Sequence, residues 1–255
     1  MKPNPYLGKL IVFESLDGSG QTTQAQLLAK WFMEKRDQLA FYTKEPTDGP
    51  VGSLLKLVLS NRLVCANGDK KHGPLDEITM ALFFAADRAD HLHNEISSKL
   101  KNSIQVIADR YYLSSLAYQS LVVDYEWIKE INKHTIRPDL TFFLDVPPMV
   151  CVKRMQAQRW HVELYEDLSN LERVHSNFMQ AIQRQVVEGE KIEILDGNQP
   201  AKDVHKQVVK KTKSFLKSVA TYKKKKLSKK ALHQMELLME TAPLTEKEIA
   251  AYQQG

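Results

Sequence analysis

The sequence predicts an α/β fold, a three-layer sandwich with a mainly parallel five-stranded sheet flanked by helices. Short runs rich in β-branched residues alternate along the chain with longer stretches of helical periodicity. No internal repeat and no Gly/Ser-rich or Pro-rich linker interrupts this alternation. With 255 residues, 43% hydrophobic and 26% charged, the chain has the composition of a folded protein with a sizeable core.

Five strands are expected, and each is a short apolar run: 9–14, 39–43, 103–108, 140–146 and 191–195. The helical stretches between and after them cover 22–35, 74–100, 111–122, 149–158, 164–188 and 200–216. Leu28 and Phe32, four residues apart, give the first helix an apolar face. Pro74 is expected in the first turn of the longest helix, and Pro147 ends the fourth strand.

Charge divides the chain into two regions. The net charge is +5, but positions 202 to 230 hold twelve lysines and one acid, so this stretch carries +11 and the rest −6. We therefore predict a domain over 1–218 and a Lys-rich helical appendage over 219–255. Such a stretch can contact nucleic acid or another anionic surface through its charge. Because it lacks interleaved aromatic residues, a solvated basic face is the favoured interpretation.

Composition also bears on location. No apolar run approaches the roughly 18–20 residues that span a bilayer, so we expect no membrane contact. The first apolar run ends at Glu14 and is interpreted as a strand, not as a signal peptide. Cys65 and Cys151 are the two cysteines, and they form no CxxC motif. This usage favours a reducing, cytoplasmic location and argues against a structural zinc site.

A phosphate-binding loop follows the first strand. Residues 15–23 read SLDGSGQTT and lead directly into a helix, which is the context that a P-loop requires. Glycines let the backbone turn its N–H groups inward, and the helix amino end adds positive potential for an anion. The residues expected to bind the ATP phosphates are Gly18, Ser19, Gly20, Gln21, Thr22 and Thr23.

The loop departs from the pattern G-x-x-x-x-G-K-[ST] at two positions, with Ser15 for the first glycine and Gln21 for the lysine. A glycine-bearing turn after a strand can also be a plain tight connection. Gln21 can donate a hydrogen bond to phosphate but supplies no countercharge. Removing one preorganised stabiliser of transition-state charge costs about 10²–10³ in rate. Either another cation substitutes, such as Arg154 or Arg159, or the protein is a slow enzyme or a binder.

Four further segments resemble those of thymidylate kinases, in the same order. KEPTDGPVG at 44–52 resembles the family's REPGGTPLG, and LFFAADRADH at 82–91 resembles its LLFAADRAQH helix. DRYYLSSLAYQ at 109–119 resembles the signature DRYxxSSLAYQ, and PDLTFFLDVP at 138–147 resembles PDLTLYLDVP. The resemblance spans about residues 7–216. It implies a P-loop NTPase fold, phosphorylation of dTMP to dTDP with ATP and Mg²⁺, and a homodimer.

The resemblance also assigns a dTMP site residue by residue. Phe84 matches the aromatic side chain that stacks on thymine, and Arg88 matches the guanidinium that binds the thymine carbonyl. They lie four residues apart, so both can point from one helical face. Taken alone, Phe84 would be interpreted as a core residue and Arg88 as a solvated charge. The full set implied for dTMP is Asp17, Lys44, Phe84, Arg88, Arg110, Ser115, Tyr118 and Gln119.

The catalytic residues implied are Asp109, Arg110 and Arg159. Asp109 and Thr22 match the Mg²⁺ site, and Arg110 matches a cation that neutralises charge between donor and acceptor. Without the motif, Asp109 and Arg110 would be interpreted as a surface ion pair, and Arg159 remains equally consistent with a solvated loop charge. Two other functions stay open. One is a catalytically weak or inactive homologue that acts as a nucleotide-binding sensor or scaffold, and the other is a kinase for another nucleotide.

Overall fold

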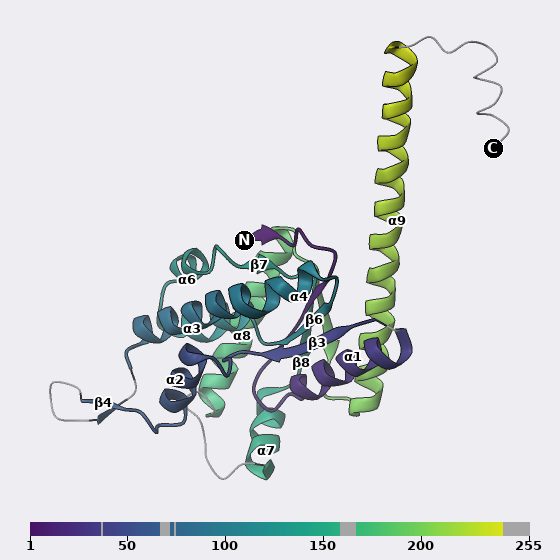
Figure 1. Ribbon diagram of the computed structural model, residues 1–255. Coiled ribbons are helices and arrows are strands. Elements are labelled where there is room, and N and C mark those ends of the chain that lie inside the picture. Colours follow the sequence, from purple (N-terminus) through teal and green to yellow (C-terminus); the bar gives the residue numbers. More distant parts are fainter. Residues whose placement is uncertain (37, 67–71, 74, 159–166, 242–255) are drawn as a thin grey trace. The chain divides into compact units, whose positions relative to one another are not determined.

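The computed structural model describes residues 1–36, 38–66, 72–73, 75–158 and 167–241 (Figure 1). At its centre is a five-stranded sheet of order β3-β6-β2-β8-β9, in which every pair is parallel. The strands are β2 Leu10–Glu14, β3 Ala40–Lys44, β6 Gln105–Asp109, β8 Leu140–Asp145 and β9 Ile192–Asp196. Each lies within two residues of a predicted strand, so the predicted α/β fold is confirmed.

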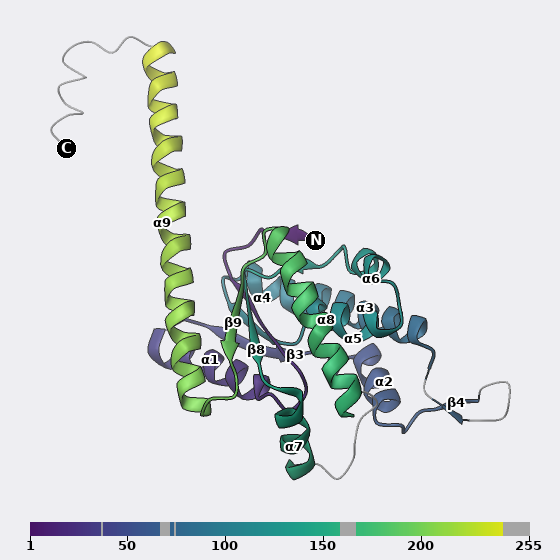
Figure 2. The same cartoon turned by 180° about the vertical axis from the view of Figure 1, so that it is seen from behind.

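Helices cover both faces of this sheet, and its three central strands, β2, β6 and β8, are almost fully buried, whereas the edge strands β3 and β9 are partly exposed. Along β2, Leu10 and Val12 belong to a core cluster that includes Phe178 of helix α8 (Leu168–Val187). Ile11 and Phe13 point to the opposite face and are equally buried. Helix α1 (Gln21–Arg36) packs over β2, β3 and β6, and Figures 1 and 2 show helices on the two sides of the sheet.

The remaining helices lie between the strands, except α9, which follows the last strand. They are α2 Pro50–Leu59, α3 Glu77–His91, α4 Ser97–Lys101, α5 Tyr112–Tyr118, α6 Tyr125–Ile131, α7 Pro148–Gln158 and α9 Ala201–Thr241. A π-helical segment η1 (Leu92–Ile96) and a 3-10 turn η2 (Gln119–Leu121) complete them. Two small sheets pair β1 (Lys2–Pro3) with β7 (Ile136–Arg137) and β4 (Cys65–Ala66) with β5 (His72–Gly73). Helices α2 and α6 and both small sheets were not predicted.

The helix predicted over 74–100 is in fact three segments, α3, η1 and α4. Its expected start was wrong: α3 begins at Glu77, after Asp76, whose side chain accepts a hydrogen bond from the Thr79 amide at 3.0 Å. The Asp76 carboxylate accepts a hydrogen bond from a free backbone N–H of the first turn, which favours a helix that starts here. The helix predicted over 111–122 ends at Tyr118 and continues as η2.

Helix α9 is longer than predicted and passes without a break through positions 218 and 219. Lysine is a good helix former, so a lysine run raises the net charge without ending the helix. The chain divides into two compact units, Met1–Val209 and Lys210–Gly255, and the separate role of 219–255 stays a prediction. The terminal residues from 242 lie outside the described part. In that part, no helix combines the length and apolarity that a bilayer crossing requires.

Candidate active site

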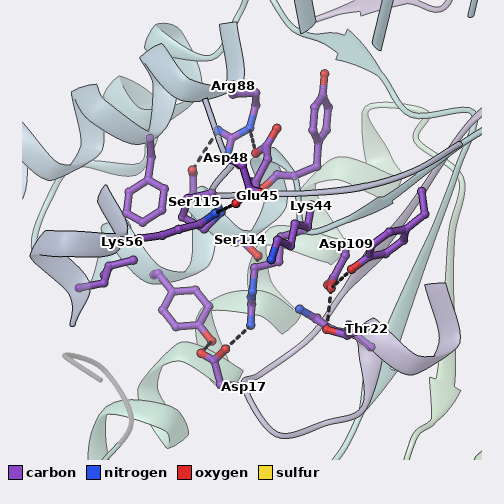
Figure 3. Close-up of a pocket in the computed structure, with 18 of the residues that line it drawn as sticks. Asp17, Thr22, Lys44, Glu45, Asp48, Lys56, Arg88, Asp109, Ser114 and Ser115 are labelled. Carbon is purple, nitrogen blue, oxygen red and sulfur yellow. Dashed lines mark hydrogen bonds and ion pairs between the residues drawn. The ribbon is translucent and has the colours of Figure 1, made fainter. Parts of the chain in front are cut away.

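A cavity of about 690 Å³ opens where β2, β3 and β6 end, which is the side on which open parallel sheets bind ligands (Figure 3). Figure 3 shows Thr22 and Asp109 at one end of it and Arg88 with Glu45 and Ser115 at the other. The residues predicted from the sequence that line it are Asp17, Gln21, Thr22, Lys44, Phe84, Arg88, Asp109, Arg110, Ser115, Tyr118 and Gln119. Residue 159 lies outside the described residues. Gly18, Ser19, Gly20 and Thr23, which were also predicted, are not among the residues that line the cavity.

The loop between β2 and α1 turns on two glycines. Gly18 and Gly20 have φ of +78° and +95°, a region that side chains disfavour. A Cβ at Gly18 would lie 2.7 Å from the Cys151 carbonyl oxygen, so glycine is required there on steric grounds as well. Ser19 is buried, and its hydroxyl accepts a hydrogen bond from the Gln21 amide at 3.3 Å. Helix α1 begins at Gln21, so its first turn lies at the cavity wall.

The two departures from the P-loop pattern have different structural consequences. The Ser15 hydroxyl is buried and donates to the Leu144 carbonyl of β8 at 2.5 Å, so it points into the sheet. The Gln21 side chain lines the cavity, and its Oε1 is buried without a hydrogen-bond partner among the described residues. The position usually taken by lysine therefore holds a neutral group with unused hydrogen-bonding capacity.

Thr22 and Asp109 meet where helix α1 begins. The Thr22 hydroxyl donates to Asp109 Oδ2 at 2.6 Å, and the Tyr42 hydroxyl donates to the same oxygen at 3.2 Å. Asp109 Oδ1 is buried and has no partner within the described part of the chain. A hydroxyl and a carboxylate oxygen are the hard ligands that Mg²⁺ prefers, and the unpartnered oxygen leaves capacity for one. The two residues fit a Mg²⁺ site.

Arg110 is fixed at the cavity wall. Its backbone has φ of +72°, and its guanidinium donates to the Ser15 carbonyl at 3.0 Å, to Ser114 Oγ at 2.9 Å and to Asp17 Oδ1 at 2.7 Å. Asp17 also accepts from the Tyr118 hydroxyl at 2.8 Å. Burial acts to lower the pKa of Arg110, but the charges of Asp17, Asp109 and Glu14, together with Tyr118, raise it overall, so the cation persists.

Glu14 contacts Ser114, which in turn contacts Arg110, and this role of Glu14 was not predicted. Its buried carboxylate accepts from the amides of Tyr111 and Ser114, at 3.0 and 3.2 Å, and from the Ser114 hydroxyl that also contacts Arg110. Burial raises the pKa of Glu14 to about 7, against the opposing effects of the Ser114 hydrogen bond and the Arg110 charge. A glutamate at the end of an apolar strand gives no sign in the sequence of this role.

Arg88 is buried, so its interpretation as a solvated helix charge was wrong. Its Nε donates to Glu45 Oε2 at 2.8 Å, and Nη1 donates to Ser115 Oγ at 3.0 Å and to Asn132 Oδ1 at 2.6 Å. Asn132 lies in no motif, and only the fold brings it to Arg88. Phe84 lines the cavity and also packs against the small core cluster of α2 and α3, so it is both a partly buried core residue and a lining residue of the cavity, and its role in base binding stays a prediction.

Other cations lie nearby. Lys44 lines the cavity, as does Lys56 of α2, which was not predicted and forms an ion pair with Asp48. Arg154 of α7 donates to the Ser19 carbonyl of the phosphate loop at 3.1 Å and to Asn198 at 3.3 Å. These three are the described candidates for the positive charge that Gln21 lacks.

Comparison with known proteins gives a consistent result. A protein-family model described as thymidylate kinase matches residues 13–208 of the sequence. A probable thymidylate kinase of Thermococcus gammatolerans is 35% identical over 209 residues, which are 80% of this chain and 95% of that protein. One of Thermococcus onnurineus is 37% identical over 205 residues, 78% of this chain and 94% of that protein. One of Methanococcus aeolicus is 37% identical over 208 residues, 80% and 96% of the two chains.

Proposed function

This chain belongs to the thymidylate kinase family, and from this premise we propose that it transfers the γ-phosphoryl group of ATP to dTMP, forming dTDP and ADP. The observation that best supports the proposal is that one cavity is lined by the Thr22–Asp109 pair, by the fixed arginine Arg110, and by Phe84 with the buried Arg88. Its volume of about 690 Å³ is in the range of small-ligand pockets.

At the phosphate end, the backbone amides of the loop bind the triphosphate. Thr22 and Asp109 hold Mg²⁺, which when bound neutralises charge on the donor phosphates. A phosphate oxygen of dTMP forms a bond to the γ-phosphorus as the bond from that phosphorus to the β–γ bridging oxygen breaks, and ADP leaves. Because the second phosphate pKa is near 6, the acceptor is largely ionised at neutral pH and needs no strong base. Arg110 holds donor and acceptor together against their repulsion.

At the base end, Phe84 stacks on the thymine ring and Arg88 donates to a ring carbonyl. Gln119 lines the cavity, and its buried Oε1 has no partner among the described residues, which suits pairing with the base edge. Ser115 helps to hold Arg88, and Asp17 with Tyr118 forms the wall facing the sugar. These roles favour dTMP over other monophosphates.

The decisive experiment is a coupled ADP-release assay over a panel of monophosphates, with the wild-type chain beside Gln21→Lys. We expect dTMP to give the highest kcat/KM and Gln21→Lys to raise it. The rival function, a nucleotide-binding sensor or scaffold, is motivated by the neutral Gln21. It requires that ATP and dTMP bind while no ADP is released. Absence of turnover with every monophosphate would overturn the proposal.

We propose a homodimer in the cytoplasm. Exposed apolar side chains on α2 and α3, namely Leu57, Ile78 and Leu82, offer a surface that a second copy could cover. Sedimentation velocity of wild type and of Ile78→Asp tests this. A dimer that the substitution converts to monomer supports it, and a wild-type monomer at micromolar concentration contradicts it.

For the region 219–255 we propose a solvated basic segment, in keeping with its lysine content. Nucleic-acid binding is the competing proposal, and it predicts that affinity for a short DNA duplex falls steeply with salt. Fluorescence anisotropy of the full chain against salt distinguishes the two. The comparison variant replaces the four lysines at 223–226 by glutamine.

A further inference from the structure

A chain of four ionisable side chains, Arg88, Glu45, His91 and Glu95, runs from the cavity wall to the surface of the protein. Arg88 contacts Glu45 at 2.8 Å, Glu45 Oε1 contacts His91 Nδ1 at 3.0 Å, and His91 Nε2 contacts Glu95 Oε2 at 3.1 Å. The first three side chains are at most 3% exposed, whereas Glu95 is 42% exposed. Arg88, His91 and Glu95 are three and four residues apart, so they share a helical face that continues from α3 into η1.

The geometry around His91 fixes its protonation. On one side, Nδ1 faces a carboxylate oxygen of Glu45 whose partner oxygen already accepts from Arg88, so the hydrogen between them must be on Nδ1. On the other side, Nε2 lies 2.7 Å from Thr43 Oγ1 and 3.1 Å from Glu95 Oε2, and those two oxygens are 2.9 Å apart.

Three polar atoms in such a triangle need more than one hydrogen. Thr43 supplies one. If the Thr43 hydrogen points to Glu95, an unprotonated Nε2 would face the Glu95 carboxylate with its lone pair. If that hydrogen points to Nε2, no hydrogen lies between the Thr43 oxygen and the Glu95 carboxylate. A hydrogen on Nε2 removes the conflict, because Nε2 then donates toward Thr43 and Glu95 while Thr43 donates to Glu95.

We infer that His91 is a buried imidazolium that positions Arg88, through Glu45, for binding of the pyrimidine base. The role in base binding rests on the proposed function, whereas the charge of His91 does not. Burial acts to lower the pKa of His91, but the hydrogen bond and charge of Glu45 and the charges of Glu95 and Asp87 raise it overall. Among the described residues, further ionisable groups near these four side chains include Tyr111, whose ring lies against Arg88, and Glu14, whose pKa the Arg88 charge acts to lower.

The charges in this chain alternate and sum to zero only when His91 is charged. With a neutral imidazole, two carboxylates would share one guanidinium, and Glu45 would lose a charged partner inside the protein. The Nδ1 hydrogen bond to Glu45 would then lose its charge assistance, so the Glu45 carboxylate would be held less firmly. Arg88 would keep its neutral partners at Ser115, Asn132 and the Tyr111 carbonyl in unchanged strength. His91 is therefore a positioning residue, and it does not itself touch the substrate.

The first test reads the charge directly. Nitrogen-15 NMR of the imidazole groups in the full-length wild-type chain at pH 7, assigned with His91→Gln, should show both His91 ring nitrogens protonated. A single neutral tautomer at pH 7 would overturn the inference. This measurement is independent of any enzymatic activity.

The second test reads base binding. Thymidine is the probe, since it lacks the phosphate whose own ionisation near pH 6 would confuse the profile. By calorimetry, wild-type affinity should fall roughly tenfold as pH rises through the pKa of His91, the scale expected when a charge-assisted contact is lost. His91→Gln should bind thymidine roughly tenfold more weakly at pH 6 and show no such pH dependence.

Glu95→Gln changes the chain at its solvent end, so it is the variant least expected to disturb folding. It should lower the pKa of His91 and move the loss of thymidine affinity to lower pH. Glu34→Gln is the matched control, because Glu34 is also the exposed i,i+4 partner of a cation, Lys30. If Glu95→Gln leaves the pH dependence of thymidine affinity unchanged, the proposed role of His91 is refuted. If wild type binds neither thymidine nor dTMP while His91 is charged, the proposed function fails and the protonation stands.

Discussion

The two ends of the cavity are prepared for ligand to different degrees. At the base end, Arg88 is buried and already holds Glu45, Ser115 and Asn132, so its direction is fixed before any ligand arrives. At the phosphate end, Gln21 Oε1 and Asp109 Oδ1 are buried and have no partner in the described part of the chain. The arginine proposed to bind the base is therefore preorganised, although Gln119 Oε1 at the same end also has no partner among the described residues, whereas the free carboxylate oxygen of Asp109 at the phosphate end awaits a cation.

The phosphate end nevertheless contains one preorganised element, Arg110, and removing it should have the largest effect. We expect Arg110→Met to lower kcat/KM for dTMP by about 10³ or more, because a positioned arginine at a transferring phosphoryl group contributes about that much. Arg184→Met removes an exposed, remote arginine and serves as the control. Steady-state ADP release measures both. If Arg110→Met lowered kcat/KM by less than tenfold, another residue would have to neutralise the charge at the transferred phosphoryl group.

Glu14, which contacts Arg110 through Ser114, makes the stability of the folded protein depend on pH. Burial raises the pKa of Glu14 from 4.5 to about 7. The stability that protonated Glu14 contributes to the folded state is fully present below pH 4.5 and is lost as pH rises toward 7. Above that pH the free energy of unfolding is lower by about 3 kcal/mol.

Urea unfolding of wild type and Glu14→Gln at pH 5 and pH 8 tests this. The variant should gain stability relative to wild type by up to about 3 kcal/mol between the two pH values. An unfolding difference that is the same at both would show that Glu14 does not titrate in this range.

Restoring the P-loop lysine should sharpen the contrast between the ends. Gln21→Lys is expected to raise kcat by about 10², because a cation replaces a neutral amide beside developing phosphate charge. The KM for dTMP should change little, since the base end is untouched. An unchanged kcat would mean that Lys44, Lys56 or Arg154 already supplies the charge. Combining Gln21→Lys with Lys56→Met or Arg154→Met would then identify which one.

The smallest effect is expected at Ser15. Its hydroxyl points into the sheet and donates to Leu144, so Ser15→Gly should cost about 1 kcal/mol of stability and leave kcat within about twofold. Thermal unfolding and the ADP-release assay measure the two quantities. A large drop in kcat would show that this serine shapes the loop around the phosphates.

The sequence was most informative where local pattern and function coincide. Strand β2, the glycines at 18 and 20 and the start of α1 were all predicted, because a strand, a positive-φ turn and a helix N-terminus each leave a local signature. The end of α9 was misjudged, since helix propensity does not change across a lysine run. Helix α2 was missed, since no helix was predicted between the strand at 39–43 and the helix at 74–100.

By itself, the sequence determined the sheet, the phosphate loop and the family, all of which depend on neighbouring residues or on motifs of fixed spacing. The tertiary structure decided which side chains meet. Glu14 reaches Ser114 across 100 positions and Arg88 reaches Asn132 across 44, and neither pair has a pattern that spacing could reveal. His91 is one helical turn from Glu95, but its charge depends on Thr43 and Glu45 from another strand and loop. Protonation is a property of the surroundings in three dimensions, because burial and neighbouring charges together set which form of a group is stable.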